Sequence, residues 1–191
     1  MCVFRYEMLV NRGVLLDEKF VPPCLREPQI PFAAPKGHMK RKMEGKAAEA
    51  AQELFAAGER QGLSLYGVSG YRPYDRQREL FEKNPASLYV APPGASEHQT
   101  GLALDVSCPA VGMELEEVFE HTPEGRWLAR NAPLYGFILR YPKDKTEITG
   151  YAYEPWHIRY VTKSLALYLT LTGLTLEEYH SYLPTVPSAA P

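Results

Sequence analysis

A run of alternating residues at positions 101–107 (GLALDVS) limits the folds open to this 191-residue chain more than any other feature of its sequence. Leu102, Leu104 and Val106 fall on one face of the strand that the alternation predicts, and Asp105 falls on the other face. A carboxylate on a buried strand is costly unless it is paired or bound to a metal ion. The sequence therefore predicts a core strand whose acidic residue has a partner from another part of the chain.

The helices and strands predicted before and after residues 101–107 in the sequence indicate the fold class. Apolar residues at helical spacing predict a helix over residues 39–61, and Thr122-Pro123 provides the cap and first position of another helix that ends near Gly136. Further helices are predicted after Pro73, over residues 162–172, and after Thr175, which forms a capping box with Glu178. The other predicted strands span residues 63–69, 137–141 and 156–160. This order favours an α+β fold, a single domain with a small, mainly antiparallel central sheet flanked by helices.

The chain is expected to form one domain with two flanking segments. Residues 1–38 are irregular and rich in proline, which predicts an arm packed on the domain rather than a separate fold. Residues 39–184 contain the predicted helices and strands, and residues 185–191 have the composition of a frayed tail.

Composition excludes several classes of protein. Hydrophobic residues make up 45% of the chain, as in ordinary globular proteins, and the net charge of −2 provides no basic field for nucleic acid. No apolar run approaches the ~18–20 residues that a membrane helix needs, and residues 1–11 lack the pattern of a signal peptide. We therefore expect a cytoplasmic protein if the chain is complete, or a protein of the cell envelope if a leader has been removed.

Cysteine usage points away from disulfides and from a cysteine metal site. Cys2, Cys24 and Cys108 are three scattered residues without a CxxC pair, which fits neither a disulfide framework nor a zinc ribbon. Cys108 follows the predicted strand closely, but a small buried thiol is a commoner use of such a residue than a nucleophile.

The segment 96–105 (SEHQTGLALD) offers the first candidate partner for Asp105. Glycine at position 101 permits a turn that lets His98 fold back over the strand carrying Asp105. With a second histidine, these side chains would provide three nitrogen and oxygen ligands and leave one position open for water, as in catalytic zinc sites. A lone histidine near a strand is more often structural, so the interpretation depends on that second histidine.

The segment 154–157 (EPWH) supplies His157 together with a carboxylate. Pro155 keeps Glu154 extended, so Glu154 is expected to lie beside the metal-bound water and to act as a general base. Taken singly, Trp156 fits a core position and Glu154 fits a solvated surface acid, but the two segments together favour a zinc site. The remaining histidines lack comparable neighbours and are expected in surface or packing roles: His38, His121 and His180.

A third segment, SGYRPYDRQ (residues 69–77), places Arg72 between a predicted strand and a predicted helix, where side chains line clefts. A fixed guanidinium can stabilise the oxyanion that forms when water attacks a peptide carbonyl. Taken alone, the segment fits a surface ion pair equally well.

Together, the segments SGYRPYDRQ, SEHQTGLALDV and EPWHIRYV closely resemble the VanY-type D-alanyl-D-alanine carboxypeptidases. These zinc peptidases are related to the VanX dipeptidases, certain phage endolysins and the zinc domain of hedgehog proteins. The resemblance extends over most of the chain, and its SxHxxGxAxD and ExxH spacings are specific in combination. It implies a zinc metallo-carboxypeptidase that removes C-terminal D-alanine from peptidoglycan stem peptides, or from their precursors, by attack of metal-bound water.

The resemblance also implies a role for each motif residue. His98, Asp105 and His157 would bind one Zn²⁺ per chain at the sheet face. Glu154 would be the general base and acid, and Arg72 would polarise the scissile carbonyl. The positions that match the family's substrate contacts and pocket wall are Ser96, Gln77 and Trp156.

Three alternative functions remain open at this point. An L,D-carboxypeptidase would act on tetrapeptide stems with the same residues. A cell-wall endopeptidase of the endolysin type usually carries a separate wall-binding module, which is not visible in this sequence. A non-catalytic zinc-binding module would not need Glu154 and Arg72 beside the ligands. The oligomeric state does not follow from the sequence.

Overall fold

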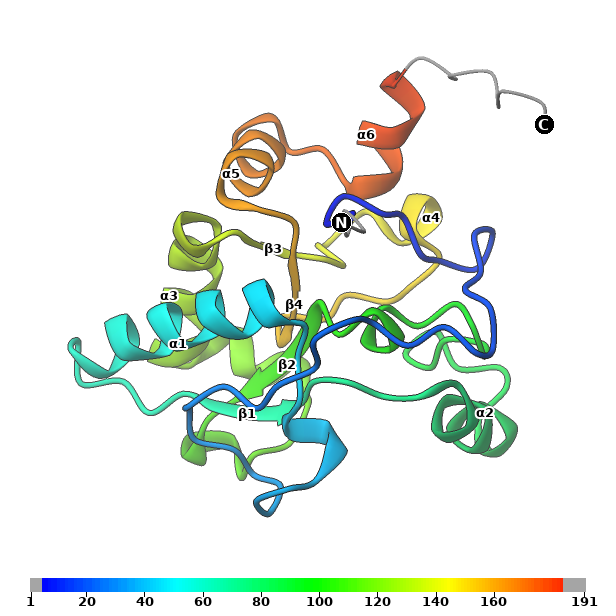
Figure 1. Ribbon diagram of the computed structural model, residues 1–191. Helices are drawn as coiled ribbons and strands as arrows, with labels where there is room; N and C mark the ends of the chain where they lie inside the picture. Colours follow the sequence, from blue (N-terminus) through cyan, green and yellow to red (C-terminus); the bar gives the residue numbers. More distant parts are fainter. Residues whose placement is uncertain (1–4, 184–191) are drawn as a thin grey trace.

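In the computed structural model, which describes residues 5–183, the chain folds around a four-stranded antiparallel sheet (Figure 1). The strands follow the order β1-β2-β4-β3, with bounds β1 Tyr66–Ser69, β2 Ala103–Ser107, β3 Phe137–Leu139 and β4 His157–Tyr160. Each lies within a strand range predicted from the sequence. The expected α+β class with an antiparallel sheet is confirmed.

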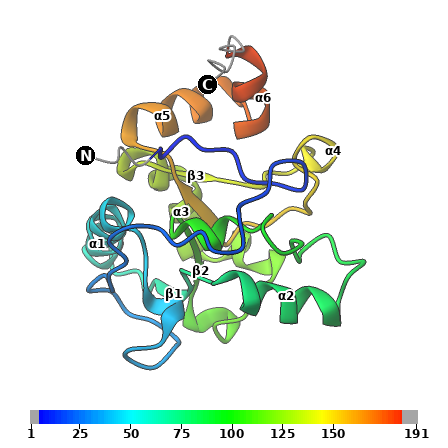
Figure 2. The ribbon, with the colours of Figure 1, turned by 45° about the vertical axis from the view of Figure 1, so that its right-hand side comes forward.

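Helices surround this sheet on several sides. The α-helices are α1 Gly45–Glu59, α2 Tyr74–Lys83, α3 Pro123–Asn131, α4 Thr146–Thr149, α5 Lys163–Thr172 and α6 Leu176–Tyr182. Short 3₁₀ helices are η1 Met39–Arg41, η2 Glu97–Thr100, η3 Pro109–Val111, η4 Glu117–His121 and η5 Ala132–Tyr135. Figures 1 and 2 show α1 and α3 on one side of the molecule, α2 on the other, and α5 and α6 beyond β3.

The helix predicted over residues 39–61 is interrupted after its first turn. Lys42 adopts an extended backbone, and Glu44 caps α1 by accepting hydrogen bonds from its first backbone N–H groups. Met43, between them, pairs with Arg26 of the N-terminal segment in an antiparallel bridge. The prediction of one continuous helix is therefore wrong, because apolar spacing alone does not register a cap within the run.

The caps predicted for two later helices are confirmed. The Thr122 hydroxyl accepts a hydrogen bond from the third residue of α3, and Thr175 forms a capping box with Glu178 at the start of α6. The α3 segment does not continue as an α-helix to Gly136. It tightens into η5, where Pro133 has no N–H to donate to the helical ladder.

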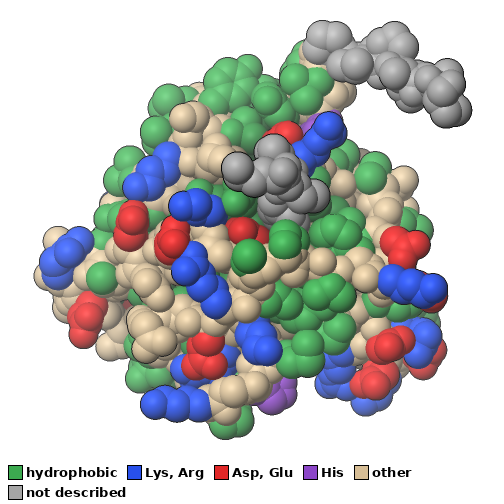
Figure 3. Space-filling model, in the orientation of Figure 1, with side chains coloured by type: hydrophobic (Ala, Val, Ile, Leu, Met, Phe, Trp, Pro, Cys, Tyr) green, Lys and Arg blue, Asp and Glu red, His purple; other side chains and the backbone are tan. Residues whose placement is uncertain are grey.

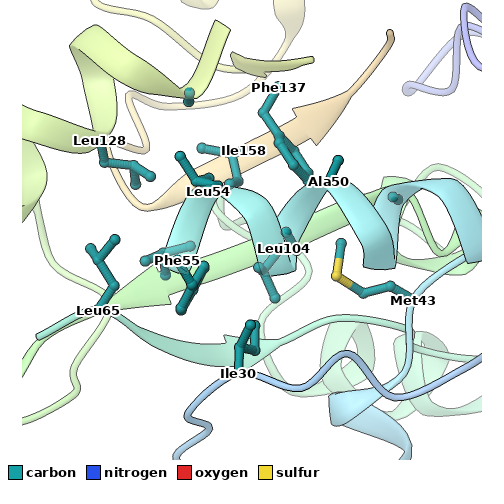
Figure 4. Close-up of a cluster of buried hydrophobic side chains, with 14 of the residues drawn as sticks. Ile30, Met43, Ala50, Leu54, Phe55, Leu65, Leu104, Leu128, Phe137 and Ile158 are labelled. Atoms are coloured by element: carbon teal, nitrogen blue, oxygen red, sulfur yellow. The ribbon is translucent and has the colours of Figure 1, made fainter. Parts of the chain in front are cut away.

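The main hydrophobic core lies between α1 and the sheet. Figure 4 shows Leu54 and Phe55 of α1 clustered with Leu104 of β2 and Ile158 of β4. Leu54, Leu104 and Ile158 have 0% exposure, and burial of a side chain of this size contributes about 1.5–3 kcal/mol. The apolar face predicted for residues 101–107 is therefore the core face.

The N-terminal arm, drawn in blue in Figures 1 and 2, runs across the domain from α6 to β1. Arg26 and Met43 exchange two backbone hydrogen bonds of 2.9 Å. Phe32 bridges to Gly67, where an added Cβ would lie 2.5 Å from the Phe32 ring. These contacts join Arg26 and Phe32 to the domain, while the predicted division into arm and domain stays a prediction. The tail predicted for residues 185–191 lies outside the described residues.

The surface mixes charges of both signs. Figure 3 shows blue and red side chains together over α2, at the lower right, where Arg76 pairs with Glu79 and Arg78 pairs with Asp75. Such exposed pairs contribute little to stability. Among the helices of residues 5–183, none has the length and apolar character needed to cross a membrane.

Candidate active site

The β2–β4 ladder places Asp105 directly opposite His157. Opposed residues of antiparallel strands share a face of the sheet, and Asp105 Oδ1 lies 3.0 Å from His157 Nδ1. One position earlier on β2, Leu104 is paired with Ile158 and both point into the core. One strand register therefore forms the core and brings these two predicted ligands together.

His98 reaches the same point through the turn at Gly101. Gly101 has a left-handed φ of 70°, and a Cβ there would lie 2.9 Å from the backbone nitrogen of Glu44, so glycine is required. His98 Nε2 lies 3.1 Å from Asp105 Oδ2, and His98 Nδ1 lies 2.7 Å from the carbonyl oxygen of Gly70. An Nδ1–H that donates to this carbonyl leaves Nε2 free as a ligand.

These three side chains fit the requirements of a zinc ion. Their ligand atoms lie within 4.8 Å of one another, and all three residues are buried. Tetrahedral zinc with bonds of ~2.0–2.1 Å separates its ligand atoms by about 3.3 Å. The contacts of Asp105 with His157 and His98, at 3.0 and 3.1 Å, are close to that spacing. No other trio of such side chains within residues 5–183 meets as closely.

Burial and mutual contacts set the charges of the ligands. Burial raises the pKa of Asp105, but His98 and His157 outweigh it and hold that pKa below its usual value. Burial lowers the pKa of His98. Burial also opposes charge on His157, but its hydrogen bonds to Asp105 and Glu97 raise the pKa to about 9. A metal ion bound by this set would meet an ionised carboxylate and displace a proton from His157.

Glu154 lies beside the ligands without belonging to their group. Its backbone N–H donates to the carbonyl of Tyr141 at 3.1 Å, and its Oε2 lies 3.6 Å from His157 Nδ1. Burial raises the pKa of Glu154 to about 8, against the opposing effect of His157. A carboxylate held beside the ligand group can accept and return a proton. This position fits the predicted general base.

Arg72 enters the site from the turn after β1. Its Nη2 lies 3.8 Å from Asp105 Oδ2 and donates to the Ser69 hydroxyl at 3.2 Å. Its Nη1 donates to Gln77 Oε1 at 2.9 Å, and Gln77 Nε2 donates to the carbonyl of Ala91 at 2.6 Å. Gln77 is 1% exposed and lies behind Arg72. Its role as a direct substrate contact stays a prediction, and Gln77 is not among the residues that line the cavity.

A cavity of about 470 Å³ opens beside the ligands. The predicted site residues line it, with the exception of Gln77. The Trp156 ring stacks on Tyr89, with centroids 6.1 Å apart, and the Tyr89 hydroxyl donates at 3.0 Å to Glu117, which also lines the cavity. Trp156 also packs in the main hydrophobic core, so its side chain lies between the cavity and the core, and its contact with substrate stays a prediction.

Tyr141 lines this cavity although no sequence motif singled it out. It is 4% exposed, and its ring lies 4.9 Å from the His157 ring. Among the described residues, neither the Tyr141 hydroxyl nor the Ser96 hydroxyl has a hydrogen-bond partner, and both residues face the cavity. Only the packing of residues 137–141 against β4 brings Tyr141 to the site, so the sequence carries no local signal for it.

Glu97 is a second residue that the sequence analysis missed. Its carboxylate accepts hydrogen bonds from Arg140 and Arg159 at 2.7 and 2.6 Å, and its other oxygen lies 3.5 Å from His157 Nε2. Burial raises its pKa, but the two guanidinium groups hold that pKa well below its usual range. Arg140 and Arg159 lie within the apolar runs 137–141 and 156–160. Because buried charges need partners, these arginines could have indicated a buried carboxylate such as Glu97.

The sequence model of the VanY family, described as D-alanyl-D-alanine carboxypeptidase, matches residues 40–163, which contain all the predicted site residues. This chain belongs to the VanY family.

Several proteins are similar to this chain in sequence or in fold. YodJ of Bacillus subtilis (strain 168) is 45% identical over 178 residues, which are 90% of this chain and 65% of YodJ. The LdcB LD-carboxypeptidase has a TM-score of 0.88 at 44% identity, over 92% of this chain and 86% of its own. A variant of the vancomycin-resistance D,D-pentapeptidase VanY, in complex with Zn(II), has a TM-score of 0.75 at 32% identity. The match covers 92% of this chain and 98% of the pentapeptidase chain. The chain spans 45% to 66% of the length of the curated relatives it matches.

Proposed function

We propose that this VanY-family protein is a zinc-dependent carboxypeptidase that removes C-terminal D-alanine from peptidoglycan stem peptides ending in D-Ala-D-Ala. One observation carries the proposal: His98, Asp105 and His157 converge beside a cavity that also holds Glu154 and Arg72. A metallopeptidase needs three protein ligands that leave one metal position open. It also needs a carboxylate outside the ligand set and a fixed guanidinium. The family assignment and the Zn(II) complex of a VanY relative support it.

Glu154 moves the proton of the reaction. His98, Asp105 and His157 would hold the zinc ion, which would supply a Lewis acid for the peptide carbonyl and for the attacking water. Glu154 accepts a proton from the attacking water as the new C–O bond forms. It returns that proton to the amine nitrogen as the C–N bond breaks, which releases free D-alanine.

Arg72 stabilises the negative charge that develops on the carbonyl oxygen. Ser69 and Gln77 hold its guanidinium in one orientation, and only 18% of the side chain is exposed. A preorganised, partly desolvated donor of this kind is typically worth about 10²–10³ in kcat.

The hydroxyls of Ser96 and Tyr141 are suited to the terminal carboxylate of the substrate. Both face the cavity, and among residues 5–183 neither has a hydrogen-bond partner. A carboxylate is an anion that hydroxyl and guanidinium donors bind through charge-assisted hydrogen bonds. The cavity volume of about 470 Å³ suits the end of a peptide.

Mass spectrometry of purified stem peptides tests the proposal. The zinc-loaded protein is incubated with a pentapeptide stem that ends in D-Ala-D-Ala, and the products are weighed. Loss of one alanine residue, with free D-alanine detected, is the expected result. An intact pentapeptide, or cleavage at an internal bond, would contradict it.

A second candidate, an L,D-carboxypeptidase, is favoured by one observation. The chain is more similar to the LdcB LD-carboxypeptidase than to the D,D-pentapeptidase, both in identity and in TM-score. Both reactions release a C-terminal D-alanine and require the same groups, but they differ in the residue that precedes it. Initial rates on pentapeptide and tetrapeptide stems, measured side by side, separate the two functions.

The substrate also suggests where the protein acts. We propose the cell envelope, because cross-linked peptidoglycan and its stem peptides are there. Fractionation of the producing cells tests this, and recovery of all of the protein in the cytoplasm would point instead to soluble precursors as substrates.

A further inference from the structure

A buried carboxylate lies behind one of the metal ligands. The Glu97 side chain has 0% exposure, and its two oxygens have different partners. Oε1 accepts hydrogen bonds from Arg140 Nε at 2.7 Å and from Arg159 Nη1 at 2.6 Å. Oε2 faces His157 Nε2 at 3.5 Å, the outer limit of a hydrogen bond. Within residues 5–183, Oε2 has no other hydrogen-bonding partner.

His157 needs an acceptor at this nitrogen. It turns Nδ1 toward Asp105, so it would bind a metal through Nδ1 and carry its proton on Nε2. His98 has the reverse arrangement, with Nε2 toward Asp105 and Nδ1 against the carbonyl of Gly70. The acceptor for His98 is fixed by the backbone, whereas the acceptor for His157 is a flexible side chain that must be fixed by other means.

Two arginines fix the Glu97 side chain. Arg159 is itself anchored, because its Nη2 donates to the carbonyls of Tyr6 at 3.1 Å and Met8 at 2.8 Å in the arm. Arg140 is held by both oxygens of Glu177 in α6, at 2.6 and 2.9 Å. The arm and α6 lie side by side in Figures 1 and 2, so both ends of the described chain support this carboxylate.

We propose that Glu97 is a positioning residue for His157: held by Arg140 and Arg159, it keeps the imidazole turned with Nδ1 toward the metal. The inference rests on the zinc site of the proposed function. A purely structural role is the competing explanation, since two buried guanidinium groups need carboxylates to balance their charge. Both explanations predict a less stable protein when Glu97 is changed, but only positioning predicts a change in metal binding.

The variants Glu97→Gln and Glu177→Gln separate these explanations. Glutamine at position 97 can still offer an oxygen to the arginines, but the NH₂ beside His157 cannot accept its proton. We expect the zinc dissociation constant of Glu97→Gln, measured by competition with a chelator, to rise about 10–100-fold. Glu177→Gln removes a charge from the same network without contacting His157, and is expected to lower Tm while leaving the zinc dissociation constant close to that of the wild-type protein.

Nitrogen-15 NMR of the histidines in the zinc-loaded wild-type protein provides a measurement that does not depend on a variant folding. The expected spectrum shows His157 protonated on Nε2 and His98 protonated on Nδ1. Metal binding through His157 Nε2, or equal zinc affinity of Glu97→Gln and the wild type, would overturn the positioning role and leave the proposed function intact. A wild-type protein that binds no zinc would overturn both.

Discussion

Asp105 and His157 are directly opposed in the β2–β4 ladder, with Asp105 Oδ1 3.0 Å from His157 Nδ1. A slip of one residue in this pairing would turn one of the two side chains to the other face of the sheet. The neighbouring pair, Leu104 and Ile158, makes such a slip unfavourable because it would expose buried leucine and isoleucine. The core therefore preorganises two of the three ligands, and single ligand substitutions should remove the metal without moving the strands.

The first prediction concerns the ligands. His157→Ala and His98→Ala are each expected to lose most bound zinc and the activity together, because only two ligands remain. Elemental analysis of the purified variants measures the metal. His121→Ala, which changes an exposed histidine outside the ligand group, is the control and should keep one zinc per chain. The assignment is wrong if both ligand variants also keep one zinc per chain.

The second prediction separates Glu154 from the ligands. Glu154→Ala should keep its zinc, because Glu154 is a base beside the ligand group, while the rate falls by ~10²–10⁴ from lost acid–base help. Steady-state rates and metal content are measured on the same preparations. Glu116→Gln changes an exposed carboxylate of the same cavity and should retain its rate. Zinc loss from Glu154→Ala, or a rate equal to that of the wild type, would remove this role.

Two of the candidate ligands, His98 and Asp105, could be brought together from the sequence because they lie in one segment, whereas His157 lies on a different strand and was singled out by its own motif. The turn that returns His98 to Asp105 needs a residue with a left-handed backbone conformation, and a glycine, Gly101, stands at that position in the same segment. Tyr141 and Gln77 are different. The packing of β3 against β4 brings the Tyr141 ring to His157, and the loop around Ala91 decides which way the Gln77 amide points. Contacts between segments far apart in the chain leave no pattern within either segment.

The secondary structure could likewise be predicted where it depends on neighbouring residues, and not where it depends on contacts between distant segments. The alternating strands and the caps at Thr122 and Thr175 were predicted, since each depends on neighbouring residues. The break before α1 was not, because Met43 leaves the helical path to pair with Arg26 in the arm. Short helices such as η3, η4 and α4 are too brief to show periodicity. The division at residue 38 stays a prediction.

The third prediction concerns the charge and shape of Arg72. Lysine keeps the charge but loses the planar fork that reaches Ser69 and Gln77 together. Arg72→Lys is expected to lower kcat more than it raises KM, because the contact strengthens as charge develops on the carbonyl oxygen. Full kinetics on the pentapeptide stem measure both constants. An effect on KM alone would make Arg72 a ground-state anchor of the substrate.

The fourth prediction tests whether Gln77 acts through Arg72. Gln77→Met keeps the volume but removes the acceptor for the guanidinium. If Gln77 only orients Arg72, the variant lowers kcat, and the double variant with Arg72→Lys loses little more activity than Arg72→Lys alone. Independent, additive losses, with KM raised by Gln77→Met, would instead support the direct substrate contact predicted from the sequence.

The last prediction is that the substrate needs a free C-terminal carboxylate. The hydroxyls of Ser96 and Tyr141 face the cavity and have no hydrogen-bond partner among residues 5–183, so an anion there would satisfy both donors. A D-Ala-D-Ala peptide should therefore have a higher kcat/KM than its C-terminal amide, by roughly 10–100-fold for each charge-assisted bond lost. Tyr141→Phe should lower the ratio of the two kcat/KM values. The variant loses a hydroxyl donor that the peptide with a free carboxylate uses more than the peptide amide does. An endopeptidase, whose groove is open at both ends, would cleave both peptides at similar kcat/KM, and that outcome would favour the endolysin type of activity over a carboxypeptidase.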